Sequence, residues 1–373
     1  MTIKSLLLSS ATALGAVSGA HAADAIAAAE PEPLEYVRIC DAYGTGYFFI
    51  PGTETCLKVG GMVRTEGEWY DAYDPKHVTG TLWHTRAELH LDTATDTEYG
   101  PLKTNMVLRW DWNDGNSTTA KLLWANISLG GFLVGKADSQ FSSFLGYAGD
   151  VIQDDVVSYG PGPTNTELNQ LTYTYDAGNG FQAMVSLEDS VSGNDTYYDE
   201  DFVQSNGRSW RTGEADHYAP DVVAGALYKS GNWQVGLVGG YDSIVEQGAI
   251  KVRVDATFGP VALFLMGGWN TDGDKLNKYA SGYVTDGACP ANKEELCGWG
   301  DWAVWGGGSY QINEKLKANL QLAYTDSKIF AAAANVKFNP VKDLTIEPEV
   351  EYTNWDSTNE DQWAGILRFQ RSF

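Results

Sequence analysis

The feature that most constrains this chain is the alternation of apolar and polar residues with a period of two, which is clearest at the C-terminus. Over 362–373 the apolar set consists of Trp363, Gly365, Leu367, Phe369 and Phe373. Alternate residues of a strand point to opposite faces, so one face is apolar and the other polar. About sixteen such segments follow one another over 57–373, a pattern typical of strands between lipid and water. Because an open sheet edge cannot be satisfied in a bilayer, the chain is predicted to be all-β, a closed transmembrane antiparallel β-barrel of about 16 strands.

The alternation also predicts which side chains face the water-filled interior. Lys58 and Arg64 alternate with apolar neighbours in the first strand, and Glu349 does so near the end of the chain. Three segments alternate imperfectly, namely 131–136, 222–229 and 329–338.

The N-terminal sequence resembles an export signal. Lys4 precedes an apolar run over 6–17, and Ala20-His21-Ala22 is a small-residue cleavage site. This predicts a signal peptide over 1–22, followed by a periplasmic segment over 23–56 that leads into the barrel at 57. The formal charge is −24, and loss of Lys4 with the signal leaves −25. A nucleic-acid partner is not expected, because phosphates require a basic surface.

The connections between strands are of two kinds. Short turns are expected at 130–131, 176–180, 230–231, 259–260 and 311–314. Longer loops are expected near 70–80, 137–168, 189–221, 242–249 and 270–300. Short turns at one end and long loops at the other are characteristic of outer-membrane barrels, with both termini in the periplasm. The expected location is therefore the outer membrane, in contact with lipid and lipopolysaccharide.

The four cysteines form two local pairs, Cys40 with Cys56 and Cys289 with Cys297. An exported chain folds in an oxidising compartment, so two local disulfides are expected, although four cysteines allow three pairings. A metal site is the weaker interpretation, since no histidine or further cysteine stands at a suitable spacing.

Several motifs resemble one known family. They are EYVRICDAYGTGYFFIPGTETCLK at 35–58, GYAGDVIQDDV at 146–156, GDWAVWGG at 300–307 and RFQRSF at 368–373. These stretches resemble the alphaproteobacterial general porins, the family of the Brucella and Rhizobium outer-membrane porins. The resemblance spans the chain and departs mainly in 189–221 and 270–300. It implies a sixteen-stranded homotrimeric barrel that passes ions and small hydrophilic solutes passively without a cofactor, and whose third external loop folds inward.

The segment 137–168 is the candidate for that inward loop, here termed the constriction loop. It interleaves apolar residues with carboxylates, among them Asp138, Asp150, Asp154 and Asp155. Taken alone, these residues fit an ordinary external loop equally well, and it is the family resemblance that favours a loop lining the aqueous path.

Basic residues that the alternation turns inward would face the acidic loop. They are Lys58, Arg64, Arg86, Lys103, Arg109, Lys251, Arg253 and Arg368. A basic wall opposite an acidic loop makes a transverse field that filters ions. Pairing of these residues with Glu88, Asp111 or Asp255 is the alternative. The charge of the mature chain predicts a weak preference for cations, although charges on outer loops are screened within roughly 8 Å.

Some residues would also suit functions other than a passive pore. His84 and His90 flank Glu88 on one strand face, a set that could serve acid–base chemistry, but no Gly-x-Ser-x-Gly nucleophile motif accompanies them. No enzyme activity and no metal are therefore expected. A sugar-specific channel would need inward aromatic residues, for which Trp124 and Trp305 are candidates. A barrel acting as an adhesin or envelope anchor would have a plugged interior.

Overall fold

A computed structural model describes residues 38–71, 80–113, 116–117, 119–154, 157–161, 167–190, 219–243, 245–274, 277–280, 298–356 and 359–373. Contacts separate Met1–Arg38 from Ile39–Phe373, and the fold concerns the second unit. The predicted signal peptide 1–22, Asp155, Cys289 and Cys297 lie outside the described residues. No helix of the described ranges is long and apolar enough to span a membrane.

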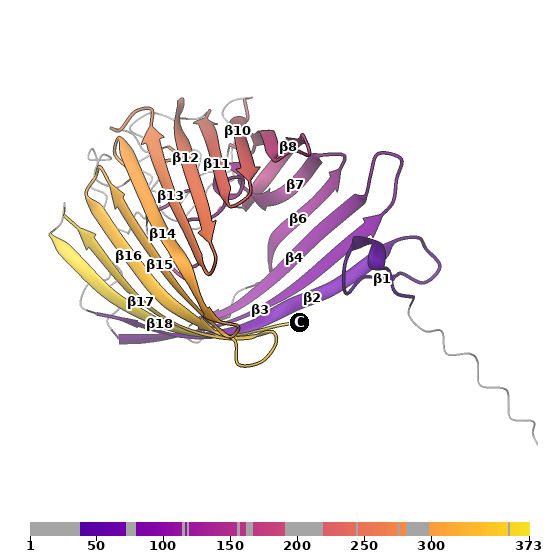
Figure 1. Ribbon diagram of the computed structural model, residues 1–373, viewed down its shortest axis with the longest axis horizontal. Coiled ribbons are helices and arrows are strands. Elements are labelled where there is room, and N and C mark those ends of the chain that lie inside the picture. Colours follow the sequence, from indigo (N-terminus) through magenta and orange to yellow (C-terminus); the bar gives the residue numbers. More distant parts are fainter. Residues whose placement is uncertain are drawn as a thin grey trace, which may run out of the picture. The chain divides into compact units, whose positions relative to one another are not determined.

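The second unit is a closed barrel of sixteen long antiparallel strands. Consecutive long strands pair with one another, and β18 pairs with β2 to close the sheet (Figure 1). Each of the sixteen long strands that the structure describes thus has a paired neighbour on both sides, as a bilayer requires. The elements are η2 Asp41–Tyr43, β1 Phe48–Phe49, β2 Cys56–Tyr70, β3 Gly80–Thr95, β4 Leu102–Asn113, β5 Asn116–Ser117, β6 Lys121–Leu129, β7 Phe132–Asp138, α1 Gln140–Ser143, β8 Glu167–Asp176, β9 Phe181–Glu188, β10 Asp221–Ser230, β11 Trp233–Asp242, β12 Gln247–Phe258, β13 Val261–Asn270, β14 Trp302–Asn313, β15 Leu316–Thr325, β16 Ile329–Phe338, β17 Leu344–Trp355 and β18 Glu360–Ser372.

The outer face of the barrel carries the apolar half of the alternation. On β2, Val59, Val63 and Trp69 are about half exposed, whereas Glu66 between them is buried. A soluble protein rarely exposes so much contiguous apolar surface, so this face is the lipid contact. The predicted register and sixteen strands are confirmed, and the three imperfect segments are strands β7, β10 and β16.

Two predicted connections differ from the structure. Strands β7 and β8 extend to Asp138 and from Glu167, so the constriction loop occupies 139–166 rather than 137–168. The predicted long loop at 242–249 is wrong, because β11 reaches Asp242 and β12 begins at Gln247, which leaves only 243–246 between the two strands. In both cases backbone pairing continues past the end of the clear alternation.

The entry to the barrel is covalently fixed. Cys40 and Cys56 form a disulfide, which confirms the first expected pair. Phe49 of β1 pairs with Cys56 of β2, so the bridge and the strand pairing hold the same segment.

Candidate functional site

The constriction loop packs inside the barrel. Phe141, Leu145 and Ala148 are buried in one apolar cluster with wall residues such as Leu227 and Val238. These two wall residues alternate with the exposed residues of β10 and β11, so they face the interior. The apolar residues of the loop therefore pack against the inner wall, and the inward fold expected from the family resemblance is confirmed.

The root of the loop is held by a carboxylate of β9. Glu188 accepts hydrogen bonds from Ser139 Oγ at 2.8 Å and from the backbone N–H of Gln140 at 2.8 Å. Ser139 in turn caps α1 by accepting from the N–H of Phe141 at 3.1 Å. Since irregular backbone that is buried must find partners for its polar groups, Glu188 stabilises the turn into the loop.

Arg253 of β12 lies beneath the next part of the loop. It donates to the carbonyl oxygen of Gly146 at 2.9 Å and to that of Tyr147, and it pairs with Asp255 at 2.7 Å. Its guanidinium also lies 4.7 Å from the ring centroid of Phe264. Arg253 therefore binds loop backbone instead of facing the open path.

The returning limb is held through three consecutive carbonyl groups. Tyr159 accepts from Lys251 Nζ, Ser158 from Trp299 Nε1 at 2.7 Å, and Val157 from Trp305 Nε1 at 2.7 Å. Lys251 is fully buried, with its ammonium 4.4 Å from the ring centroid of Phe141. Lys251 and Trp305 are thus inward, as predicted, but the loop covers both.

The tip of the loop is fixed by charges on β15 to β17. Glu349 accepts from the N–H groups of Ile152 at 2.6 Å and Gln153 at 2.8 Å. Asp150 pairs with Lys317 at 2.8 Å and with Lys337. Burial raises the pKa of Asp150, but the two lysines outweigh burial and hold that pKa below its ordinary value.

The opposite side is a charged wall, defined as the inward charges of β2, β3, β4 and β18. Arg86 pairs with Asp111 at 2.6 Å, and Arg368 donates to Glu66. Arg64 donates to Gln370 at 2.8 Å and lies 3.9 Å from Glu66. Two residues after Arg86 on β3, Glu88 pairs with Arg109 of β4 at 2.7 Å. These arginines therefore face water in company with carboxylates. Arg86 and Arg109 have the partners that the alternative interpretation named, whereas Glu66, which Arg64 and Arg368 share, was not among them.

A cavity of about 370 Å³ separates the loop tip from the charged wall. Its lining includes Ile152, Gln153 and Asp154 on one side and Arg64, Glu66, Glu68, His84, Arg86 and Arg368 on the other. An acidic residue of the loop and three arginines of the wall thus border one aqueous space.

Comparison with known proteins identifies this architecture. A family model described as the porin subfamily matches residues 24–368. The chain belongs to this porin family. It is 42% identical to porin Omp2b of Brucella suis over 395 residues, and 41% identical to porin Omp2b of Brucella abortus (strain 2308) over 391 residues, with all of each chain covered. The porin is therefore an outer-membrane channel for small solutes.

Solved structures share the fold of the porin at low sequence identity. The outer membrane channel DcaP of Acinetobacter baumannii has a TM-score of 0.59 at 18% identity, covering 87% of this chain and 99% of that chain. An anion-selective porin from Comamonas acidovorans has a TM-score of 0.58 at 14% identity, covering 86% and 100%. These likenesses concern the barrel and not its selectivity.

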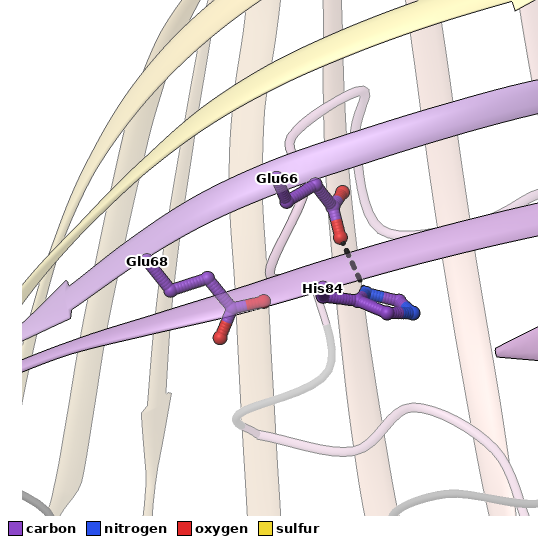
Figure 2. A group of neighbouring side chains, drawn as sticks. All are labelled: Glu66, Glu68 and His84. Atoms are coloured by element: carbon purple, nitrogen blue, oxygen red, sulfur yellow. Dashed lines mark hydrogen bonds and ion pairs between the residues drawn. The ribbon is translucent and has the colours of Figure 1, made fainter. Parts of the chain in front are cut away.

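His84 of the porin lies between two carboxylates of the charged wall. Its Nδ1 is 2.8 Å from Glu66 and its Nε2 is 2.8 Å from Asp111. Figure 2 shows Glu66 and Glu68 of β2 on the same side of the wall as His84 of β3. Two carboxylates and a histidine can ligate a metal. Here, however, both ring nitrogens face carboxylate oxygens, an arrangement that suits an imidazolium donating two N–H groups and leaves no nitrogen for a metal.

Other predicted site residues of the porin lie away from this cavity. Lys58 is 6.0 Å from the ring of Tyr47, near the disulfide-linked entry, and Lys103 is exposed near the start of β4. Asp138 ends β7, where it accepts from Trp124 Nε1 at 2.8 Å. Trp305 is buried and cannot stack a sugar along a path, whereas Trp124 is partly exposed with its Nε1 bound to Asp138.

The predicted site did not include four groups that hold it together, although the alternation had already placed Glu349 on the inward face. They are Glu66, Lys317, Lys337 and, as the anchor of the loop tip, Glu349. All four occupy the inward set of the alternation, which was the available signal.

Proposed function

We propose that this porin is a passive diffusion pore with a weak preference for cations, in which the constriction loop and the charged wall set the limits on size and charge. Water, ions and small hydrophilic solutes would pass between Asp154 and the three arginines. The charged residues predicted for the site would have different roles. They are the acidic loop residues Asp138, Asp150, Asp154 and Asp155 and the eight predicted basic residues. Those bordering the cavity would act on solutes, and those beneath the loop would position it.

The observation that carries the cation preference is the position of Glu68. Arg368 and Arg64 share Glu66, Arg86 pairs with Asp111, and His84 bridges Glu66 and Asp111. Glu68 also lines the cavity, yet among the described residues it forms no salt bridge and accepts only from the neutral hydroxyl of Tyr70 at 2.9 Å. A carboxylate without a paired cation attracts cations to the cavity between the loop tip and the charged wall.

The assembly is proposed to be a homotrimer in outer-membrane lipid and lipopolysaccharide. Support for the trimer comes from the family motifs of the sequence. Residues 1–22 would be removed on export, and 23–56 would lie in the periplasm before the barrel.

The test is conductance in a planar bilayer, with reversal potentials in a salt gradient for the wild type and for Glu68→Gln. Large stable steps in groups of three are expected, with weak cation preference in the wild type. A unit charge at about 7 Å in water contributes about 0.6 kcal/mol for a cation and the opposite amount for an anion, so the cation-to-anion permeability ratio should fall by up to roughly sevenfold in the variant.

Glu314→Gln, in the exposed turn between β14 and β15, is the matched control and should leave the ratio unchanged. Anion preference in the wild type would contradict the proposed selectivity. A folded protein without conductance would favour the plugged anchor or adhesin.

A further inference from the structure

The described parts of a second connection also pack inside the barrel. Between β13 and β14, residues 277–280 and Trp299 are almost completely buried. The wall is shaped to receive them, because a Cβ on Gly240 would lie 2.7 Å from the ring of Tyr279 and one on Gly268 would lie 2.5 Å from Trp299. Glycine at both wall positions thus leaves the space that these two rings occupy.

The buried part of this connection is fixed by polar contacts. Lys278 Nζ pairs with Asp221 at 3.0 Å, and the Lys278 N–H donates to Asp242 at 2.8 Å. Asn277 donates to Asn270 Oδ1 at 2.8 Å. Polar groups so deeply buried are stable only with their partners in place, so these contacts define one position for the segment.

Tyr279 joins this segment to the root of the constriction loop. Its hydroxyl donates to Glu188 Oε2 at 3.0 Å, the oxygen that also accepts from Ser139. Its ring centroid lies 5.0 Å from that of Phe141. Trp299, at the far end of the connection, contacts the returning limb through Ser158. Both limbs of the constriction loop therefore touch the second connection.

We propose that Tyr279 is a positioning residue of the pore, acting through Glu188 to hold the root of the constriction loop. This inference rests on the proposed role of that loop in permeation. The carboxylate of Glu188 is buried and is held by three donors, so removal of one donor leaves an oxygen poorly satisfied and weakens the hold on Ser139 and Gln140.

The test compares Tyr279→Phe, Glu188→Gln and the double variant, with Tyr241→Phe as the control. Tyr241 lies on the lipid face of β11, about half exposed. The first readout is hydrogen–deuterium exchange of peptides covering 139–146, with strand peptides as an internal reference. Loss of a hydrogen bond to a charged carboxylate destabilises the docked root, so hydrogen–deuterium exchange of these peptides should be about tenfold faster in Tyr279→Phe. The double variant should not exceed the larger single effect, because both changes act on one contact.

The second readout is the frequency of brief closures in single channels, which should rise in Tyr279→Phe and not in Tyr241→Phe. Unchanged exchange, or additive effects in the double variant, would overturn the inference. Faster exchange with unaltered conductance and closures would support the positioning by Tyr279 while overturning the proposed constriction. Gly240→Ala, which crowds the Tyr279 ring, provides a second route and should reproduce the faster exchange in folded, heat-modifiable protein.

Discussion

The two sides of the constriction use charge in different ways. On the charged wall, Arg64, Arg86 and Arg368 pair with neighbouring carboxylates and border an aqueous cavity. Beneath the loop, Arg253 and Lys251 are buried and donate to main-chain carbonyl groups. All five residues satisfy the same alternation rule. Their roles therefore depend on whether the constriction loop covers them, and not on their place in the pattern.

The comparison separates filtering from positioning. A charge that borders water acts on passing ions through its field, which the solvent weakens but does not abolish. A charge beneath the loop acts by satisfying buried backbone, where loss of one partner leaves an uncompensated polar group. Changes on the first side should alter selectivity, and changes on the second should alter the persistence of the open channel.

The largest effect is expected from Glu349→Ala. This change leaves the N–H groups of Ile152 and Gln153 without their acceptor, at a cost to loop docking of about 3 kcal/mol. Single-channel records should show many more closures and a broader distribution of conductance. Glu314→Ala, in an exposed turn, should behave as wild type. Quiet, uniform channels in Glu349→Ala would show that the tip does not depend on this carboxylate.

Arg253→Gln should produce the next largest effect, on the same side of the comparison. The glutamine side chain cannot reproduce the pair of bonds to Gly146 and Tyr147, so closures should increase severalfold while the reversal potential stays near the wild-type value. The measurement is a single-channel record combined with a salt-gradient reversal potential. A change of selectivity as large as that of a charged-wall variant would break the distinction between the two sides.

Much of this arrangement was predictable from the sequence. The remainder could not be predicted, and the reason is physical. Alternation placed Arg253 and Glu349 on the interior face correctly, since the period of a strand is a local property. That Glu349 would meet Ile152, 197 residues earlier in the chain, depends on how an irregular loop folds across the barrel. The cover over Arg253 was missed for the same reason.

On the charged wall, Arg368→Gln should shift the ion selectivity without increasing the frequency of closures. It leaves Glu66 with less compensation, and a unit charge at about 7 Å in water changes the local cation concentration by roughly threefold. Reversal potentials should therefore move toward stronger cation preference, and closures should remain rare. A variant that becomes unstable with unchanged selectivity would place Arg368 on the positioning side.

Acidification should affect the loop tip through Asp150 only at low pH. The pKa of Asp150 is held below its ordinary 3.8 by Lys317 and Lys337, despite burial. A lowered pKa contributes stability that is complete above the ordinary value and is lost as the pH falls through the lowered one. Closures should thus be unchanged by this group from pH 7 to 5 and should increase below about pH 4. Asp150→Asn should lack that increase, and an increase already present at pH 5 would point to another group.

The smallest effect is expected from Lys103→Gln, which tests whether distance from the cavity decides how much a wall charge contributes. Lys103 is exposed near the start of β4 and does not line the cavity. Exposed charges farther apart than roughly 8 Å are largely screened at physiological salt. The reversal potential should therefore shift much less than in Arg368→Gln at 0.15 M salt. The difference between the two variants should become smaller as the salt concentration is lowered, because the Debye length then increases and the field of Lys103 reaches farther. Equal shifts at both salt concentrations would mean that the whole inner surface, and not the cavity alone, sets selectivity.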